Sequence, residues 1–116
     1  MIGIDICQVE RIEKLPAEKL NRIFFEEEIK YFESHKNKSQ IIAGHYAAKE
    51  AIMKAFLCCK KINFLDILIY HNTDGKPFAK LFNAPQKEFQ ENNYKSLEIS
   101  ISHEKDYACA IAQINT

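Results

Sequence analysis

The stretch IIAGHYAAKEAIMKAF, residues 41–56, decides the fold, because it predicts one long helix that is apolar around most of its circumference. Successive residues advance by about 100° around a helix, and this places the small side chains of the stretch on one face. Those side chains are Gly44, Ala47, Ala48, Ala51 and Ala55. Small residues let another backbone approach closely, so we predict a buried helix over about 40–57.

Three charged side chains interrupt this apolar helix: Lys49, Glu50 and Lys54. Glu50 and Lys54 lie one turn apart at the border of the small face, whereas Lys49 points about 100° away, on the side of His45. One interpretation is a solvated ion pair between Glu50 and Lys54, worth ~0.2–0.5 kcal/mol. The surroundings are too apolar for an idle charge, because carboxylates are rarely buried unless they are paired or bind a metal. We therefore interpret Glu50 and Lys54 as functional residues.

A second carboxylate comes from the first predicted strand, IGIDIC, residues 2–7. The alternation places three isoleucines on one face and Asp5 on the other, non-hydrophobic face. Asp5 and Glu50, with Lys54, suit a Mg²⁺ ion that holds a phosphate ester, because Mg²⁺ uses one or two protein carboxylates and fills its shell with water and phosphate oxygens. A lysine then neutralises the phosphoryl oxygens. The alternative for Asp5 is that it caps the helix that follows the strand.

The rest of the chain predicts helices first and then mostly antiparallel strands, which is an α+β fold. Helix is expected at 8–15, within 17–35, and at 83–92 with Asn83 as its cap, after a polar break at 36–39. Strands are expected at 64–71, 78–82, 96–102 and 107–114. The turn at 72–77 contains Asp74-Gly75, which supplies a positive-φ position. We expect one domain over 1–116.

Composition excludes several classes of protein. The net charge is zero, so nothing in the total charge favours a nucleic-acid partner. No apolar run approaches the ~20 residues needed to cross a bilayer, and MIGIDI has no basic segment of a signal peptide. The cysteines Cys7, Cys58, Cys59 and Cys109 form no CxxC pair, which favours unpaired thiols in a reducing cytoplasm. Three glycines are too few for a glycine-rich phosphate loop.

Five segments of the chain carry the motifs of one family, in order. They are GIDICQVERI at 3–12, LNRIFFEEEIKYF at 20–32, AGHYAAKEAIMKAF at 43–56, DGKP at 74–77 and ISISHEKDYACAIA at 99–112. Together they resemble the holo-acyl-carrier-protein synthases, the small bacterial 4′-phosphopantetheinyl transferases. The resemblance implies a long central helix packed on a mostly antiparallel sheet, and a homotrimer with active sites between subunits. It also implies transfer of the phosphopantetheine arm of coenzyme A to a serine of apo-acyl carrier protein, in fatty acid biosynthesis.

The resemblance also implies roles for individual residues. Asp5 and Glu50 would hold Mg²⁺ on the diphosphate of coenzyme A, and Glu50, directly or through a metal-bound water, would accept the serine proton. Lys54 would hold the diphosphate, so these three are the expected catalytic residues. Contacts with coenzyme A are expected from Lys54, Ser102, His103, Gly75, Lys76 and Pro77. His103 is otherwise explained as a turn residue that bonds its own backbone, and the 75–77 segment by turn chemistry alone.

The expected carrier-protein surface is cationic, because acyl carrier proteins are strongly acidic. Arg11 resembles the family arginine that meets the carrier protein, and Lys14, Arg22 and Lys19 extend the surface. The alternative is an ordinary solvated helix, since glutamates interleave with these cations: Glu10, Glu13 and Glu18.

Two segments depart from the family pattern. Family members often have Arg or Trp, followed by an aromatic residue, before the Ala-Ala-Lys-Glu motif, and this chain has His45-Tyr46. Many members have a glycine-rich loop after the helix, and this chain has LCCKKIN at 57–63. Lys60 and Lys61 could still meet a phosphate by charge. The departures bear on how coenzyme A is held and leave the reaction class unchanged.

Two other functions use some of the same features. A metal-dependent phosphoesterase or nuclease also has paired carboxylates, but it usually needs more than two acidic ligands and, for nucleic acid, a broader basic surface. A trimeric carrier-protein-binding module without activity needs none of Asp5, Glu50 and Lys54.

Overall fold

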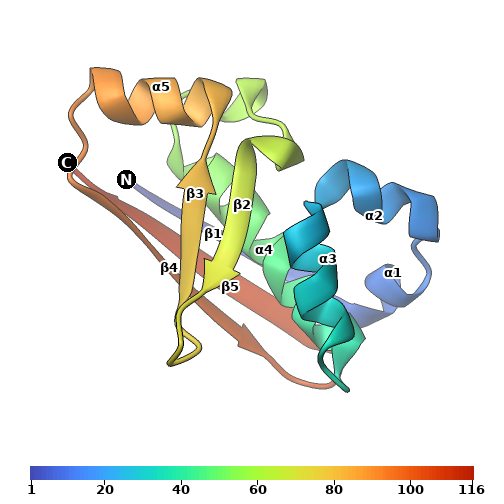
Figure 1. Ribbon diagram of the computed structural model, residues 1–116. Coiled ribbons are helices and arrows are strands. Elements are labelled where there is room, and N and C mark those ends of the chain that lie inside the picture. The colour runs from blue at the N-terminus through green and yellow to red at the C-terminus, as the bar shows by residue number, and fades with distance from the viewer.

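The computed structural model describes all residues, 1–116, and confirms the α+β class (Figure 1). In chain order the strands and helices are β1 (Ile2–Gln8), α1 (Val9–Glu13), α2 (Ala17–Ile23), α3 (Glu26–Glu33), α4 (Lys38–Ala55), β2 (Ile67–His71), β3 (Pro77–Leu81), α5 (Asn83–Glu91), β4 (Ser96–His103) and β5 (Tyr107–Asn115). Two short 3₁₀ turns, η1 (Cys59–Lys61) and η2 (Phe64–Asp66), lie between α4 and β2. No helix combines the length and the apolar character that crossing a bilayer requires.

The strands form two antiparallel sheets. β5 lies between β1 and β4 in a three-stranded sheet, while β2 and β3 form a separate hairpin. Figure 1 shows α4 lying across the three-stranded sheet with the hairpin beside it, so that α4 is enclosed by both. The helix therefore needs apolar or small residues around most of its circumference, as its sequence predicts.

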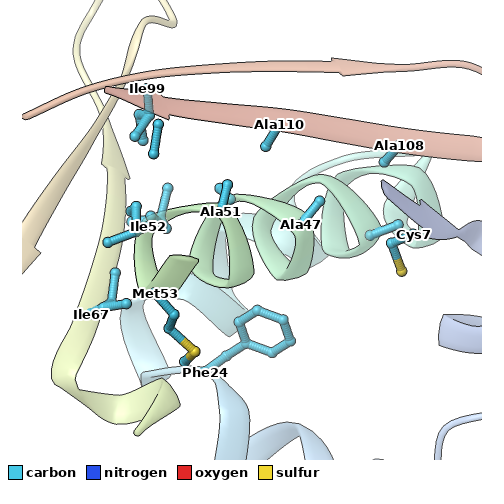
Figure 2. Packing of buried hydrophobic residues seen from close by; sticks show 14 of the residues in the cluster. Cys7, Phe24, Ala47, Ala51, Ile52, Met53, Ile67, Ile99, Ala108 and Ala110 are labelled. Atoms are coloured by element: carbon cyan, nitrogen blue, oxygen red, sulfur yellow. The ribbon is translucent and has the colours of Figure 1, made fainter. Parts of the chain in front are cut away.

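The small face of α4 lies against the three-stranded sheet. Ala47 and Ala51 are fully buried, and Figure 2 shows them facing Ala108 and Ala110 of β5. β1 comes closer still, because a Cβ atom added to Gly3 would collide with the backbone carbonyl of Ala51. Small side chains on both elements thus allow the close approach, and the larger side chains of the core fill the opposite side of the helix.

The two faces of β1 are the reverse of what alternation alone predicts. Gly3 and Cys7 are buried beneath α4, whereas the side chains of Ile2, Ile4 and Ile6 are more than 60% exposed. An alternating strand normally turns its isoleucines towards the core. Here the closeness of α4 admits only small residues, so the isoleucines lie on the outer face of the sheet.

Helix within 17–35 is confirmed, and it forms two helices because the backbone is extended at Phe24 and Phe25 between α2 and α3. Two predicted element boundaries are wrong. α4 begins at Lys38, inside the segment that we predicted to be a polar break. The predicted 64–71 strand begins only at Ile67, because the carboxylate of Asp66 accepts the backbone N–H of Asn63 and closes η2.

Asn83 does not cap α5. It is the first residue of that helix, with a positive φ of 55°, and its side-chain amide donates to Asp66 Oδ1 at 2.7 Å. The amide is committed to this tertiary hydrogen bond and makes no capping bond. The predicted positive φ at Gly75 is confirmed, at 84°.

Candidate functional site

The predicted carboxylate and lysine meet where β1 crosses α4. Asp5 is in the middle of β1, on the face that turns towards the helix, and its side chain is 16% exposed. The ammonium of Lys54 donates to Asp5 Oδ1 at 3.0 Å and to the carbonyl oxygen of Ile4 at 3.1 Å. The alternative prediction, that Asp5 caps the following helix, is wrong, because α1 begins after Gln8 and has no side-chain cap.

Glu50 lies one turn before Lys54 and acts on the same groups as Asp5. The pKa of Lys54 is raised above its ordinary value, mainly by the hydrogen bond from Lys54 to Asp5, with the charges of Asp5 and Glu50 adding to it. Burial raises the pKa of the Cys7 thiol, and both carboxylates raise it further while Arg11 opposes them. The two acidic groups, far apart in the chain, therefore act on the same two side chains, Lys54 and Cys7.

The donor set of this place fits a hard divalent cation. One oxygen of Asp5 accepts a hydrogen bond from Lys54, and the carboxylate of Glu50 makes no hydrogen bond or ion pair within the chain. No cluster of three or more His, Cys, Asp or Glu residues suited to a metal is present. Two carboxylates are nevertheless what Mg²⁺ uses when water and phosphate oxygens complete its octahedron. A zinc site would need more protein ligands than these.

The cations predicted for the carrier-protein surface differ in their surroundings. The guanidinium of Arg11 lies 5.9 Å from the ring centre of Tyr46, a neighbour of the carboxylate site on α4. Lys14 pairs with Glu10 at 2.9 Å on the exposed side of α1, so its charge is partly offset. Arg22 and Lys19 are exposed on α2. Of the four, Arg11 is the cation that influences the groups around Asp5 and Glu50.

A second group of predicted residues lines a cavity beside the N-terminal half of α4. Gly75 and Pro77 of the hairpin, Gly44 of α4 and His103 at the end of β4 all line this cavity. A ring nitrogen of His103 lies 3.1 Å from Gln40 Oε1. His103 therefore has a tertiary partner, and its position is not explained by a bond to its own turn.

Two predicted contacts with coenzyme A lie outside this cavity. Ser102 precedes His103 on β4, and its side chain is on the exposed outer face of the sheet because side chains alternate along a strand. Lys76 is exposed between Gly75 and Pro77, and its ammonium lies 5.9 Å from the ring centre of Phe78. Neither residue lines the cavity within this chain.

The carboxylate site and the cavity are separated along α4. Lys54 and Gly44 are ten residues apart, which corresponds to about 15 Å of helix rise. No hydrogen bond or ion pair joins Asp5, Glu50 or Lys54 to the residues of the cavity. The carboxylate site and the cavity are therefore separate within one chain, and we refer to them as the two half-sites.

The sequence did not reveal a buried polar network on the other side of α4. Lys49 is fully buried and donates to Glu28 Oε1 at 2.7 Å and to the carbonyl of Ile23 at 2.7 Å. Burial lowers the pKa of Lys49, against the attraction of Glu28. The sequence placed Lys49 on the side of His45 but named no partner for it, and nothing distinguishes Glu28 among the three successive glutamates at 26–28.

The segment after α4 is held by a second residue that the sequence did not reveal. Glu88 of α5 is buried and accepts the backbone N–H groups of Leu57 at 3.1 Å and Cys58 at 2.7 Å. Its carboxylate also accepts the hydroxyl of Tyr94 at 2.8 Å. Burial raises the pKa of Glu88, but these hydrogen bonds outweigh burial and lower it overall. A buried carboxylate thus fixes the backbone of the 57–63 segment, which has no glycine.

Comparison with known proteins gives similarity along nearly the whole chain. The model of the 4′-phosphopantetheinyl transferase superfamily matches residues 1–112. The holo-[acyl-carrier-protein] synthase of Thermodesulfovibrio yellowstonii is 40% identical over 117 residues, covering 97% of this chain and 96% of that protein. The enzyme of the same name from Caldicellulosiruptor bescii is 36% identical over 113 residues, covering 96% of this chain and 93% of the relative.

Solved structures share the fold. The Helicobacter pylori holo-[acyl-carrier-protein] synthase in complex with coenzyme A superposes with a TM-score of 0.84 at 35% identity, covering 99% of this chain and 100% of that one. The Bacillus anthracis synthase, in complex with CoA (3′,5′-ADP), has a TM-score of 0.81 at 32% identity, covering 97% and 93%.

Proposed function

We propose, because this chain belongs to the 4′-phosphopantetheinyl transferase superfamily, that it transfers the 4′-phosphopantetheine group of coenzyme A to a serine of apo-acyl carrier protein. Adenosine 3′,5′-bisphosphate is the leaving product. Two structural relatives were solved with coenzyme A or 3′,5′-ADP, which are the donor and the product of this reaction. The observation that carries the proposal is the hydrogen bond from Lys54 to Asp5, one helical turn from Glu50, in a chain related to synthases over nearly its full length.

The carboxylate site supplies the residues for phosphoryl transfer. Asp5 and Glu50 would hold Mg²⁺, which when bound neutralises charge on the diphosphate as the phosphoanhydride breaks. Lys54, half-exposed beside Asp5, is placed to donate to the diphosphate oxygens. Glu50 has no partner within the chain, so its carboxylate is available to accept the proton of the attacking serine, directly or through a water.

The cavity suits the nucleotide end of coenzyme A. Gly75, Pro77 and His103 surround it, and Ser102 and Lys76 lie next to them in the chain. Exposed backbone and cationic side chains at such a turn favour phosphate groups. Lys54, at the other half-site, would meet the diphosphate end.

A homotrimer is proposed for two reasons. The two half-sites lie apart on one chain, so a neighbouring copy that supplies the missing half would complete each site. The outer face of the sheet also exposes Ile2, Ile4, Ile6, Tyr107 and Ile111. Exposed apolar faces of this kind mark protein–protein interfaces. Such a symmetric assembly would bury the isoleucines that α4 excludes from the core.

The carrier protein would approach over α1. Arg11 is the central cation of the proposed surface, with Lys14 and Arg22 beside it, and the strong acidity of carrier proteins would steer them to it. A carrier of this kind serves fatty acid biosynthesis, and we expect a cytoplasmic location.

Mass spectrometry of the carrier protein tests the function. The chain is mixed with coenzyme A, Mg²⁺ and an apo-acyl carrier protein, and the mass of the carrier should rise by one phosphopantetheine group. A phosphoesterase or an inactive binding module would leave the carrier unchanged. Glu50→Gln should abolish the transfer while circular dichroism stays native, because the amide neither holds the cation nor accepts a proton.

Glu91→Gln is the matched control, since Glu91 is exposed on α5 away from both half-sites. It should transfer at the rate of the unmodified chain. Transfer by Glu50→Gln at the same rate as this control would remove Glu50 from the mechanism.

A further inference from the structure

Two histidines form a hydrogen-bonded pair at the wall of the cavity. His45 Nε2 lies 2.9 Å from His71 Nε2. At one end of the pair, His45 Nδ1 lies 3.3 Å from Glu28 Oε2, and at the other end His71 Nδ1 lies 3.2 Å from the carbonyl oxygen of Gly75. This is the only hydrogen bonding between α4 and the β2–β3 hairpin. The pair therefore ties the turn of the hairpin to the central helix.

A count of protons shows that this chain of bonds requires a charge. Both end groups, the carboxylate of Glu28 and the carbonyl of Gly75, are acceptors, so each outer ring nitrogen must carry a hydrogen. The bond between the rings requires a third hydrogen. Two neutral imidazoles supply only two hydrogens in total. The pair therefore makes all three bonds only when it carries one additional proton.

The surroundings decide which ring is the cation. His45 is 2% exposed, and burial lowers its pKa, with the charges of His71 and Lys49 acting in the same direction and Glu28 opposing them. A neutral His45 donates from Nδ1 to Glu28 and accepts at Nε2. His71, which is less buried and lines the cavity, then carries both hydrogens.

The charge on His71 is not cancelled by its neighbours. Glu28 is already paired with Lys49 at 2.7 Å, so that ion pair is neutral. The ring of Tyr31 stacks on His71 with centres 4.3 Å apart. The other ionisable groups around the pair are His35 beside Tyr31, His103 across the cavity, and Asp74 and Lys76 in the exposed turn.

We propose that His71, as an imidazolium held between His45 and Gly75, recognises a phosphate group in the cavity and positions the turn at 72–77. Loss of its proton removes the charge and forces one of the three hydrogen bonds to break, so phosphate binding and protonation of the pair favour each other. The inference rests on the proposed function, because it takes the nucleotide of coenzyme A as the source of the phosphate.

Nitrogen NMR of the histidine rings in the full chain tests the proton count directly. At about pH 5, well below the reference histidine pKa of about 6.5, we expect His71 to show two protonated ring nitrogens and His45 to show only Nδ1–H. At about pH 8.5 the pair should have lost one proton, and it should be the proton on His71. Two neutral rings at both pH values, or a cationic His45 beside a neutral His71, would overturn the proposal.

Calorimetric titration with adenosine 3′,5′-bisphosphate tests recognition. His71→Asn keeps a donor close to Gly75 but loses the cation and the bond to His45. Phosphate itself titrates near pH 6, so the measured quantity is the ratio of the affinities of the unmodified chain and the variant at each pH. We expect that ratio to fall by about tenfold from pH 5 to pH 8.5, because the attraction between the phosphate and the imidazolium charge is lost, while both N–H groups of His71 are already donated to His45 and Gly75.

His35→Asn is the matched control, because His35 also contacts Tyr31 but lies outside the pair. Its affinity should equal that of the unmodified chain at both pH values. A ratio for His71→Asn that stays constant with pH would refute recognition by the cation. The carrier protein could instead fail to gain mass while the NMR and binding results are as expected. That outcome would reject the proposed function but would still support the anion site at His71.

Discussion

Lys49 and Lys54 show how two identical side chains on one helix take opposite roles. The side chain of Lys49 is fully buried, with Glu28 and two backbone carbonyls as its closest partners, whereas that of Lys54 is 50% exposed beside Asp5. A buried ammonium stays charged only if its partners replace the lost water. Lys49 is therefore a structural residue, whereas Lys54 is accessible to solvent, as its proposed role requires.

Replacing Lys49 tests the structural role. Lys49→Met should lower the free energy of unfolding by ~3–5 kcal/mol, because it leaves the carboxylate of Glu28 buried without its cation. Urea denaturation followed by circular dichroism measures this loss. The control is Lys30→Met, which removes an exposed pair with Glu26 at 3.6 Å and should change stability by less than about 0.5 kcal/mol. Similar losses in the two variants would show that the buried pair is not a significant source of stability.

The packing of β1 against α4 depends on the absence of a side chain at Gly3. A Cβ atom at this position would also lie 2.8 Å from the backbone nitrogen of Ala55. Backbone atoms cannot move aside as a flexible side chain can, so the strand or the helix would have to shift. Because Asp5 and Lys54 belong to these two elements, a shift would separate them as well.

Gly3→Ala should therefore destabilise the chain by ~3 kcal/mol, at the upper end of the usual range for overpacking, and weaken transfer activity. Gly44→Ala is the comparison within α4. Its Cβ would lie 2.9 Å from a methyl group of Ile101, which can rotate, and alanine favours the helix by ~1 kcal/mol over glycine. We expect little net change for Gly44→Ala in thermal and urea unfolding. Equal stability of both variants would contradict the close backbone approach at Gly3.

At the scale of the whole molecule, the outer face of the three-stranded sheet exposes a cluster of large apolar side chains to solvent. Ile4, at its centre on β1, has a side chain that is 66% exposed. The opposite face of the same strand is buried beneath α4, so this exposure does not come from poor folding of the strand. The face accounts for the association of copies that we propose.

Ile4→Glu should convert a trimer into monomers, because three carboxylates would have to be buried at the interface. Light scattering after size-exclusion chromatography measures the mass, and transfer to the carrier protein should be lost together with the trimer. Tyr70→Glu is the control, since Tyr70 is 48% exposed on the hairpin rather than on the sheet. A trimeric and active Ile4→Glu variant would place the interface elsewhere.

The sequence by itself determined the α+β class, the burial of α4 and the different directions of Lys49 and Glu50. It also predicted the positive φ at Gly75. These features follow from local periodicity and turn chemistry, which each segment carries whatever its neighbours are. The prediction that Asp5 and Glu50 belong together came from the chemistry of carboxylates and the resemblance to a family.

Only the tertiary structure decided which face of β1 is buried, which of three glutamates meets Lys49, and that the rings of His45 and His71 lie within hydrogen-bonding distance. Alternation places side chains on two faces but does not say which face another element covers. Partners far apart in the chain are selected by how closely the elements pack, and here the small face of α4 sets that distance.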